Sequence, residues 1–406
     1  MGLESGLDRL LAGTPGSVTF EQAAGGTEIP TSDVQQIDPV PGSDVKLTID
    51  SDLQWAAQQA VAAEVKASGS DFGTAVVLEV GTGRILAMAT APAFDPLDPD
   101  QVKPEEWANK PVTWAMEPGS TAKLMTLAAV LNEGKMKPRS RVSVPPSLFR
   151  GGQYFKDSHE HGGLQLTLAG VLAESSNIGT VLAAEKIGGK KLYEYLKAFG
   201  VGEPTGLDLP GEQTGYVPHP KEWSDTTFPT LAFGQGMSLT AIQIANATAT
   251  IGNDGVPVQP RIIDSYTAPD GTTEQTSPVE GEPVVSPETA QTMQSMMQMV
   301  VGEGGTAKVA QVPGYLVGGK TGTAQRYDEE CGCYSGYTAS FLAMAPADDP
   351  QLVVGAWFDH PRNGYYGGEV AAPVVQKLMT AALANHNVPP TGGKRAKWPL
   401  TWGGTS

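Results

Sequence analysis

Ser120 and Lys123 are two side chains that can together carry out acyl transfer, and they lie three residues apart. Residues at this spacing share one face of a helix, so a neutral lysine amine can take the hydroxyl proton and make the serine a nucleophile. Pro118 and Gly119 precede them and favour a sharp turn. Ser120 is therefore predicted to open the helix with its backbone N–H unpaired and free to face an anion. Alone, the same spacing is also common where a surface helix begins.

Two further motifs follow in the chain. Ser175-Ser176-Asn177 lies between two apolar runs that are typical of helices, and Lys320-Thr321-Gly322 follows the short apolar run 315–319, which is typical of a strand. The first motif alone indicates a turn, and the second alone indicates a strand end. Their order and their spacing on the scale of a domain are hard to obtain by chance. Together with Ser-x-x-Lys they match the motif set of serine enzymes that react with penicillin.

The chain resembles a known family of proteins. It is similar to the class B penicillin-binding proteins, which are monofunctional peptidoglycan D,D-transpeptidases. The resemblance covers roughly residues 42 to 385 and includes segments at 44–54, 73–88, 233–243 and 305–307. The chain is most similar to the cell-division (septal) branch from actinobacteria, partly through Ser-Ser-Asn-Ile-Gly and a Cys-Gly-Cys insertion.

The resemblance implies a fold and a domain plan. The fold is of the mixed α+β class: the penicillin-recognising serine transpeptidase fold, in which helices flank an antiparallel sheet and a mainly helical insert is added. Residues 1–44 are expected to be the end of an N-terminal pedestal domain and a linker. Residues 45–388 are expected to form the transpeptidase domain, and residues 389–406 a C-terminal tail.

The same resemblance implies a role for each motif residue. Ser120 would attack the carbonyl between the two terminal D-alanines of a stem peptide. Lys123 would be the base, provided that burial and the nearby cation Lys320 lower its pKa. Ser175 would relay a proton to the leaving D-alanine, and Asn177 would orient Lys123 and the substrate amide. The terminal carboxylate of the substrate would be held by the strand motif, Lys320, Thr321, Gly322 and Thr323.

The resemblance also implies the fate of the acyl group. Backbone N–H groups of Ser120 and Thr323 would form the oxyanion hole, and removal of one such donor typically costs roughly 10²–10³ in rate. An amine from a second stem peptide would then resolve the acyl-enzyme and leave a cross-link. A β-lactam would mimic the donor and stay attached to the serine. No cofactor and no metal are expected to take part.

Three alternatives share these motifs. A D,D-carboxypeptidase differs only in using water as the acceptor, and a penicillin-sensing receptor would be acylated without turnover. A β-lactamase would need a carboxylate base for deacylation, and the insert contains no Glu-x-x-Leu-Asn segment.

Composition and terminal segments bear on partners and location. The net charge is −17 and the pI is near 4.7, which disfavours a nucleic-acid partner. Lys394-Arg395-Ala396-Lys397 is the one basic cluster and is interpreted as a solvated end. No apolar run is long enough to span a membrane. We expect a soluble fragment of a protein whose native form has a single-pass anchor, lies on the extracytoplasmic face of the cell membrane and is paired with a membrane glycosyltransferase of the division machinery.

Cys331 and Cys333 flank Gly332. An oxidising compartment would permit a disulfide between them, although the ring is small, so a disulfide and two free thiols remain equally open. Two thiols are too few for a structural zinc site.

Apolar periodicity predicts the elements that position the motifs. Helices and loops should fill residues 135–250, and the Ser120 helix should run to about Asn132. Other helices are predicted over 52–66, 288–301 and 371–384, and strands over 74–79, 84–90, 338–345 and 352–359.

Overall fold

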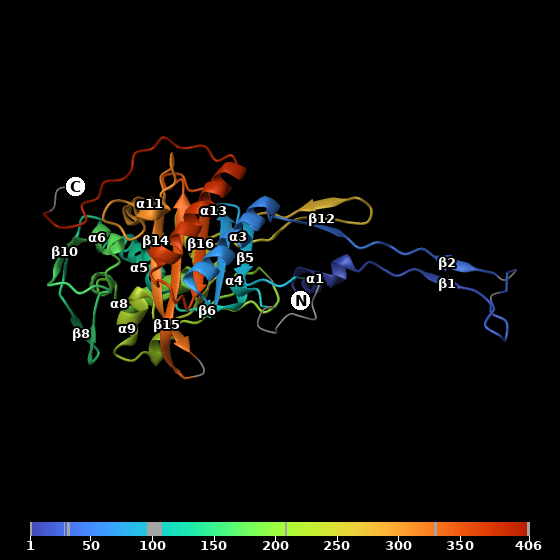
Figure 1. Ribbon diagram of the computed structural model, residues 1–406, viewed down its shortest axis with the longest axis horizontal. Coiled ribbons are helices and arrows are strands. Elements are labelled where there is room, and N and C mark those ends of the chain that lie inside the picture. Colours follow the sequence, from blue (N-terminus) through green and yellow to red (C-terminus); the bar gives the residue numbers. More distant parts are fainter. Residues whose placement is uncertain are drawn as a thin grey trace.

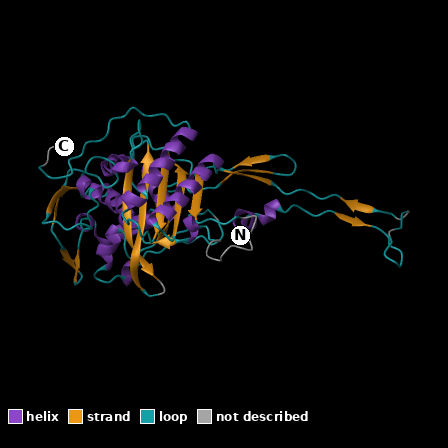
Figure 2. Cartoon of the chain, viewed as in Figure 1, coloured by secondary structure: helices purple, strands orange, loops and turns teal. Residues whose placement is uncertain are grey.

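The computed structural model describes residues 2–27, 29–30, 33–95, 108–207, 209–328 and 331–403. Its body is a five-stranded antiparallel sheet packed between helices, and a long two-stranded ribbon extends away from the body (Figure 1). Helices and strands alternate along the chain without segregating into separate halves (Figure 2). The predicted α+β class is confirmed.

The central sheet brings together strands from both ends of the domain, in the order β14-β15-β16-β4-β5. All eight residues of β16 are buried, as expected for a short apolar run in the middle of a sheet. β14 lies at one edge, so part of its backbone is available to pair with a ligand. The bounds are β4 (Phe72–Glu79), β5 (Ile85–Ala91), β14 (Gly318–Asp328), β15 (Cys333–Ala345) and β16 (Leu352–Asp359).

Four helices cover the sheet. α3 packs with α13 against strands β4, β5, β15 and β16, while α10 and α11 pack against the sheet and against each other. Capping fixes the ends of α3: the Asp50 carboxylate accepts a hydrogen bond from the Leu53 N–H at 2.9 Å, and Gly69 ends the helix with φ +66°. The bounds are α3 (Ser51–Ser68), α10 (Ala241–Gly252), α11 (Pro287–Val300) and α13 (Ala372–Asn385).

The insert between β5 and β14 is less purely helical than predicted. Besides α10 and α11, its helices are α4 (Lys110–Thr113), α5 (Lys123–Asn132), α6 (Leu168–Ala173), α7 (Asn177–Ala184), α8 (Gly188–Ala198) and α9 (Thr227–Phe233). It also contains the short strands β6 (Ala115–Met116), β7 (Arg141–Val144), β8 (Leu148–Arg150), β9 (Gln153–Phe155), β10 (Leu164–Thr167) and β11 (Leu239–Thr240). Exposed and buried residues alternate along β7, which is the two-residue period of a half-buried strand.

The N-terminal segment joins the body through strand pairing. β3 (Asp44–Leu47) pairs with β12 (Ile263–Thr267), which also pairs with β13 (Thr273–Gln275). The ribbon of β1 (Ser17–Thr19) and β2 (Gln35–Ile37) precedes them and follows the short helices α1 (Gly2–Gly6) and α2 (Asp8–Leu11). Within the described ranges, no helix has the length and apolar content needed to cross a bilayer.

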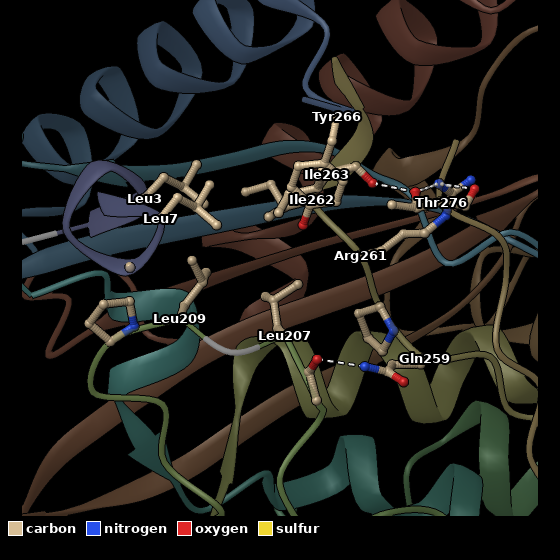
Figure 3. A pocket seen from close by; sticks show the side chains of 14 residues that line it. Leu3, Leu7, Leu207, Leu209, Gln259, Arg261, Ile262, Ile263, Tyr266 and Thr276 are labelled. Atoms are coloured by element: carbon tan, nitrogen blue, oxygen red, sulfur yellow. Dashed lines mark hydrogen bonds between the residues drawn. The ribbon is translucent and has the colours of Figure 1, made fainter. Parts of the chain in front are cut away.

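A cavity of about 340 Å³ lies where α1 meets the body (Figure 3). Leu3 and Leu7 face Leu207, Leu209 and the β12 segment across it. None of the three motifs contributes to its lining.

The C-terminal segment runs back across the body as an extended strap (Figure 1). The N–H of Thr167, the N-cap of α6, donates to the Leu400 carbonyl at 2.9 Å, and the Trp398 indole N–H donates to Ser295 Oγ at 3.0 Å. The Arg141 guanidinium lies 3.3 Å over the Trp402 ring. Lys394 and Lys397 are exposed, as expected of a solvated end, whereas Ala396 is half-buried and its N–H donates to Gln298 Oε1 at 2.9 Å.

Candidate active site

Ser120 lies in a single turn of 3₁₀-helix, η3 (Gly119–Ala122), which continues directly into α5. The predicted helix start is therefore confirmed, but its first turn is tighter than an α-helix. Gly119 has φ +54°, and a Cβ there would lie 2.9 Å from the Cβ of Ala324 on β14. Its N–H donates to the Gly234 carbonyl at 2.9 Å. Glycine at position 119 thus holds the Ser120 turn tightly against β14.

The polar groups of Ser120 are free of competing partners. Among the described residues, neither its Oγ nor its backbone N–H makes a hydrogen bond, and the residue is half-buried. The unpaired N–H predicted for a helix start is present. The predicted hydrogen bond between Ser120 and Lys123 is not formed, because the Lys123 amine is turned toward a different set of acceptors.

Lys123 is fully buried within this site. Its Nζ donates to the Asn177 Oδ1 at 2.7 Å and to the Ser175 backbone carbonyl at 2.5 Å, and lies 3.3 Å from Ser175 Oγ. Burial lowers the pKa of Lys123 to about 7, and the charge of Asp157 partly opposes this fall. A substantial fraction of this amine is therefore neutral near neutral pH and able to accept a proton.

Lys320, on β14, is also fully buried and meets the same serine. Its Nζ donates to Ser175 Oγ at 2.7 Å and to the Thr321 carbonyl at 3.0 Å. Burial lowers the pKa of Lys320 well below its ordinary value, and the charge of Lys123 lowers it further. Lys320 was expected to contribute to the low pKa of Lys123, whereas burial is its main cause. Because repulsion between like charges is mutual, it is unfavourable for the amines of Lys123 and Lys320 to be protonated at the same time.

Ser175 lies in the turn between α6 and α7, as predicted, and Asn177 is the first residue of α7. Ser175 has φ +59°, a left-handed conformation that is costly for a residue with a Cβ. Such strain is maintained only where the surroundings fix it, and it is concentrated at functional sites. The strained turn brings Ser175 Oγ within reach of both lysines.

The rest of the Lys-Thr-Gly motif lies along the edge strand β14. Thr321 Oγ1 lies 2.9 Å from Thr306 Oγ1, and Thr323 Oγ1 accepts a hydrogen bond from the Gly367 N–H at 3.2 Å. A Cβ on Gly322 would lie 3.0 Å from the Thr121 side chain and 2.2 Å from Ser340 Oγ. The glycine is needed so that the Ser120 turn can approach the strand.

The space where Gly318 and Gly319 would carry a Cβ is filled by other parts of the protein. A Cβ on Gly318 would lie 3.1 Å from the Met297 Cβ of α11, and one on Gly319 would lie 2.6 Å from the Leu342 carbonyl oxygen. Both positions allow protein elements to pack closely. β14 itself begins at Gly318, so only the last two residues of the run 315–319 belong to the strand.

Asp157 is a site residue that the sequence analysis missed. Its carboxylate accepts hydrogen bonds from Ser176 Oγ at 2.8 Å and from the Ile178 N–H at 2.9 Å, and lies 3.1 Å from His161 Nε2. These contacts fix the turn that carries Ser175. The one signal in the sequence is the polar segment 156–161, which contains two of the five histidines of the chain.

Cys331 and Cys333 form a disulfide at the end of the β14–β15 hairpin. This resolves the alternative left open by the sequence. β15 begins at Cys333 rather than near Tyr337, so the hairpin projects further than predicted. The neighbouring Tyr334 donates its hydroxyl to Glu117 Oε1 at 3.0 Å, which places the hairpin beside the nucleophile segment.

Replacing both cysteines by serine should have small effects. The bridge closes a ring around one residue, so its entropic stabilisation should be below the roughly 2–4 kcal/mol typical of longer loops. We expect a small decrease in melting temperature and a rate of β-lactam acylation that stays within about a few-fold of the unmodified protein. Calorimetry and stopped-flow acylation would measure both. A loss of about a hundredfold or more with the fold intact would mean that the pair shapes the catalytic site directly.

Among the described residues, no group of three or more His, Cys, Asp or Glu side chains is arranged to hold a metal ion. The motif residues bring together a serine hydroxyl, two buried amines, an asparagine and a strand edge.

Comparison with known proteins gives a consistent match. The family model "Penicillin binding protein transpeptidase domain" matches residues 73–380. The chain is 42% identical over 400 residues to penicillin-binding protein PbpB of Mycolicibacterium smegmatis, covering 96% of this chain and 62% of PbpB. It is 32% identical over 390 residues to peptidoglycan D,D-transpeptidase FtsI of Escherichia coli, covering 96% of this chain and 64% of FtsI.

A solved structure supports the same match. Penicillin-binding protein 3 of Mycobacterium tuberculosis in complex with aztreonam superimposes with a TM-score of 0.87 at 38% identity, covering 97% of this chain and 86% of that one. The predicted fold is thereby confirmed. The chain spans about three fifths of the length of the curated relatives that it matches.

Proposed function

The chain belongs to the penicillin-binding protein transpeptidase family, and we propose that it is a serine acyltransferase that cross-links peptidoglycan stem peptides. The single observation that carries the proposal is the meeting of Lys123, Ser175, Asn177 and Lys320 in one buried hydrogen-bonded cluster. The free Ser120 hydroxyl lies one helical turn before Lys123, in a turn packed against β14.

Ser120 attacks the carbonyl between the two terminal D-alanines of a donor stem peptide. Lys123 takes the hydroxyl proton, since burial holds the pKa of its amine at about 7. Ser175 Oγ lies between the amines of Lys123 and Lys320 and relays the proton to the leaving D-alanine. Asn177 positions the Lys123 amine through its Oδ1.

The edge strand binds the C-terminus of the donor. Lys320 holds the terminal carboxylate together with the hydroxyls of Thr321 and Thr323. The negative charge of the bound carboxylate favours the protonated form of Lys320, which burial disfavours in the free protein. Gly322 keeps the strand close to the Ser120 turn. The N–H groups of Ser120 and Thr323 stabilise the oxyanion, and a β-lactam occupies the same site as an acylating analogue.

We propose the biological setting by likeness to the septal branch of the family. The native protein is anchored on the extracytoplasmic face of the cell membrane and works with a membrane glycosyltransferase of the division machinery. The Cys331–Cys333 disulfide is in keeping with an oxidising compartment. Fractionation of cells carrying the native gene product tests this setting, and recovery from the cytosol would contradict it.

In the domain plan that we propose, residues 1–44 are the end of the pedestal domain and its linker. Residues 45–388 form the catalytic domain, and residues 389–406 form the tail.

A donor–acceptor assay tests the proposed function. A thioester analogue of the stem peptide should acylate the protein, and a D-amino acid should then appear in a new amide product. Product formed only with water would indicate a D,D-carboxypeptidase. Acylation without any turnover would indicate a penicillin-sensing receptor domain.

Replacing Lys320 by alanine should weaken acylation while the domain stays folded. The variant removes the cation that pairs with the carboxylate of the donor or the β-lactam, and an ion pair in a dry site contributes more than one at the surface. We expect a fall of about 10²-fold in the second-order acylation rate constant. Circular dichroism controls for folding. An unchanged rate constant would show that Lys320 is not the carboxylate anchor.

A further inference from the structure

A second cavity lies beside the Ser120 segment, under the β14–β15 hairpin. Its volume is about 700 Å³, within the range of sites that bind small molecules. None of the motif residues lines it. Its walls come from residues 114–117, 236–238, 325–328 and the ends of β4 and β16.

Aromatic side chains line its opening. Tyr216, Tyr327 and Tyr334 contribute to the lining and are 55%, 55% and 52% exposed. Trp114 is half-buried in the wall and packs edge-on against Phe72, with 4.6 Å between ring centroids. Exposed aromatic rings gathered at a cavity offer flat apolar surfaces with polar edges.

The charged groups of this cavity are already compensated. Arg326 pairs with Asp359 and Asp328, both at 3.1 Å, and Asp71 pairs with His360 at 3.1 Å and with Arg362 outside the lining. The remaining carboxyl group, Glu117, accepts hydrogen bonds from the Gly236 N–H and the Tyr334 hydroxyl, and burial raises its pKa.

An ionic ligand would have to displace these existing pairs. A neutral polyhydroxylated ligand can instead use the lone pairs that paired carboxylates keep, since each ionised carboxylate offers about four acceptor positions. Sugar rings combine hydroxyl edges with apolar C–H faces that stack on tyrosine and tryptophan. The lining therefore suits a carbohydrate better than an ion or a purely apolar ligand.

The cavity adjoins the catalytic site at two points of the chain. Glu117 is three residues before Ser120, a distance of at most about 11 Å along an extended chain. Gln325 is two residues after Thr323, and the intervening Ala324 touches the turn at Gly119. A donor whose carboxylate lies at Lys320 and whose scissile carbonyl lies at Thr323 continues along the β14 edge toward Gln325. Its distal end then reaches the cavity after several residues.

We propose that this cavity binds the neutral amino-sugar glycan that carries the stem peptide. The inference rests on the proposed function, because it takes the donor to be a glycan-linked peptide. It adds a second recognition site that holds the sugar while the edge strand holds the peptide.

Paired donors provide the test. Thioester stem peptides with and without an attached disaccharide are compared on the wild-type protein and on the Tyr216→Ala/Tyr327→Ala double variant. The disaccharide should lower the KM of the wild type by about tenfold with kcat unchanged, and the double variant should lose this advantage. Tyr154→Ala is the matched control, since Tyr154 is 71% exposed on the β8–β9 hairpin and does not line the cavity.

Direct binding separates the possible outcomes. Calorimetry with an N-acetylglucosamine tetramer should show saturable binding to the wild type and to Tyr154→Ala, and at least about tenfold weaker binding to the double variant. The proposal would be overturned if the double variant bound the tetramer as tightly as the wild type does, or if the wild type showed no saturable binding. Tighter binding of tetralysine than of the tetramer would assign the cavity to a cationic ligand. Penicillin acylation of the wild type is measured in parallel. Its absence would refute the proposed function, whereas tetramer binding bears on the glycan site alone.

Discussion

Replacing Ser120 by alanine should abolish covalent labelling by penicillin. The intact mass of the wild-type protein should rise by one β-lactam, and the mass of Ser120→Ala should not change. The fold should be unaffected, because the Ser120 hydroxyl makes no hydrogen bond to any described residue and its side chain is only half-buried. The loss would therefore report the missing nucleophile rather than unfolding.

Ser143→Ala is a suitable control for this experiment. Ser143 is an exposed serine on β7 whose Oγ donates to the Gln165 side chain at 2.7 Å, remote in sequence from all three motifs. It should be labelled like the wild type. Label that persists in Ser120→Ala would identify another nucleophile. Release of the label from wild-type protein within minutes would instead support the β-lactamase alternative.

The elements that depend on local pattern were predicted well. The helices α3, α11 and α13 and the strands β4, β5 and β16 all lie within a few residues of their predicted bounds. Each combines a clear period with an identifiable end signal, so neighbouring residues carry most of the information. The family prediction is likewise confirmed.

Features that depend on distant parts of the chain were not predicted. The strap is held by Thr167 and Ser295, more than a hundred residues before the groups that they bind. The extension of β15 to Cys333 depends on pairing with Asp328 in β14. No local pattern specifies such partners, because the C-terminal strap and the end of the β14–β15 hairpin are polar or irregular when considered alone.

The candidate site shows the same division. The motifs identified Lys123, Ser175, Asn177 and Lys320, and the structure places their polar groups in one cluster. The resemblance implied that Asn177 orients Lys123, but the sequence could not show that the Lys123 amine forms no hydrogen bond with Ser120. Nor could it show that Asp157 fixes the Ser175 turn, since an isolated aspartate in a polar segment is ordinarily solvated. These are consequences of tertiary packing around a fully buried amine.

That buried amine carries the second large prediction. Lys123→Met keeps the length of the side chain and removes the base, so we expect the acylation rate constant to fall by about 10²–10⁴-fold. Methionine matches the volume of the lysine side chain but leaves Asn177 Oδ1 and the Ser175 carbonyl without their donor, which costs roughly 1–3 kcal/mol, so circular dichroism checks that the variant is folded. Lys135→Met, at an exposed position just beyond α5, should acylate like the wild type. Stopped-flow measurement of acylation provides the comparison.

The pH profile distinguishes a base from a merely structural lysine. Below the pKa of about 7 the Lys123 amine is protonated and has no lone pair to accept the serine proton, so wild-type acylation should rise with pH and level off above about 7. In Lys123→Met the rising limb should disappear, whereas a structural role would lower the rate and leave the limb in place. A rising limb near pH 7 in Lys123→Met would assign the proton transfer to another group.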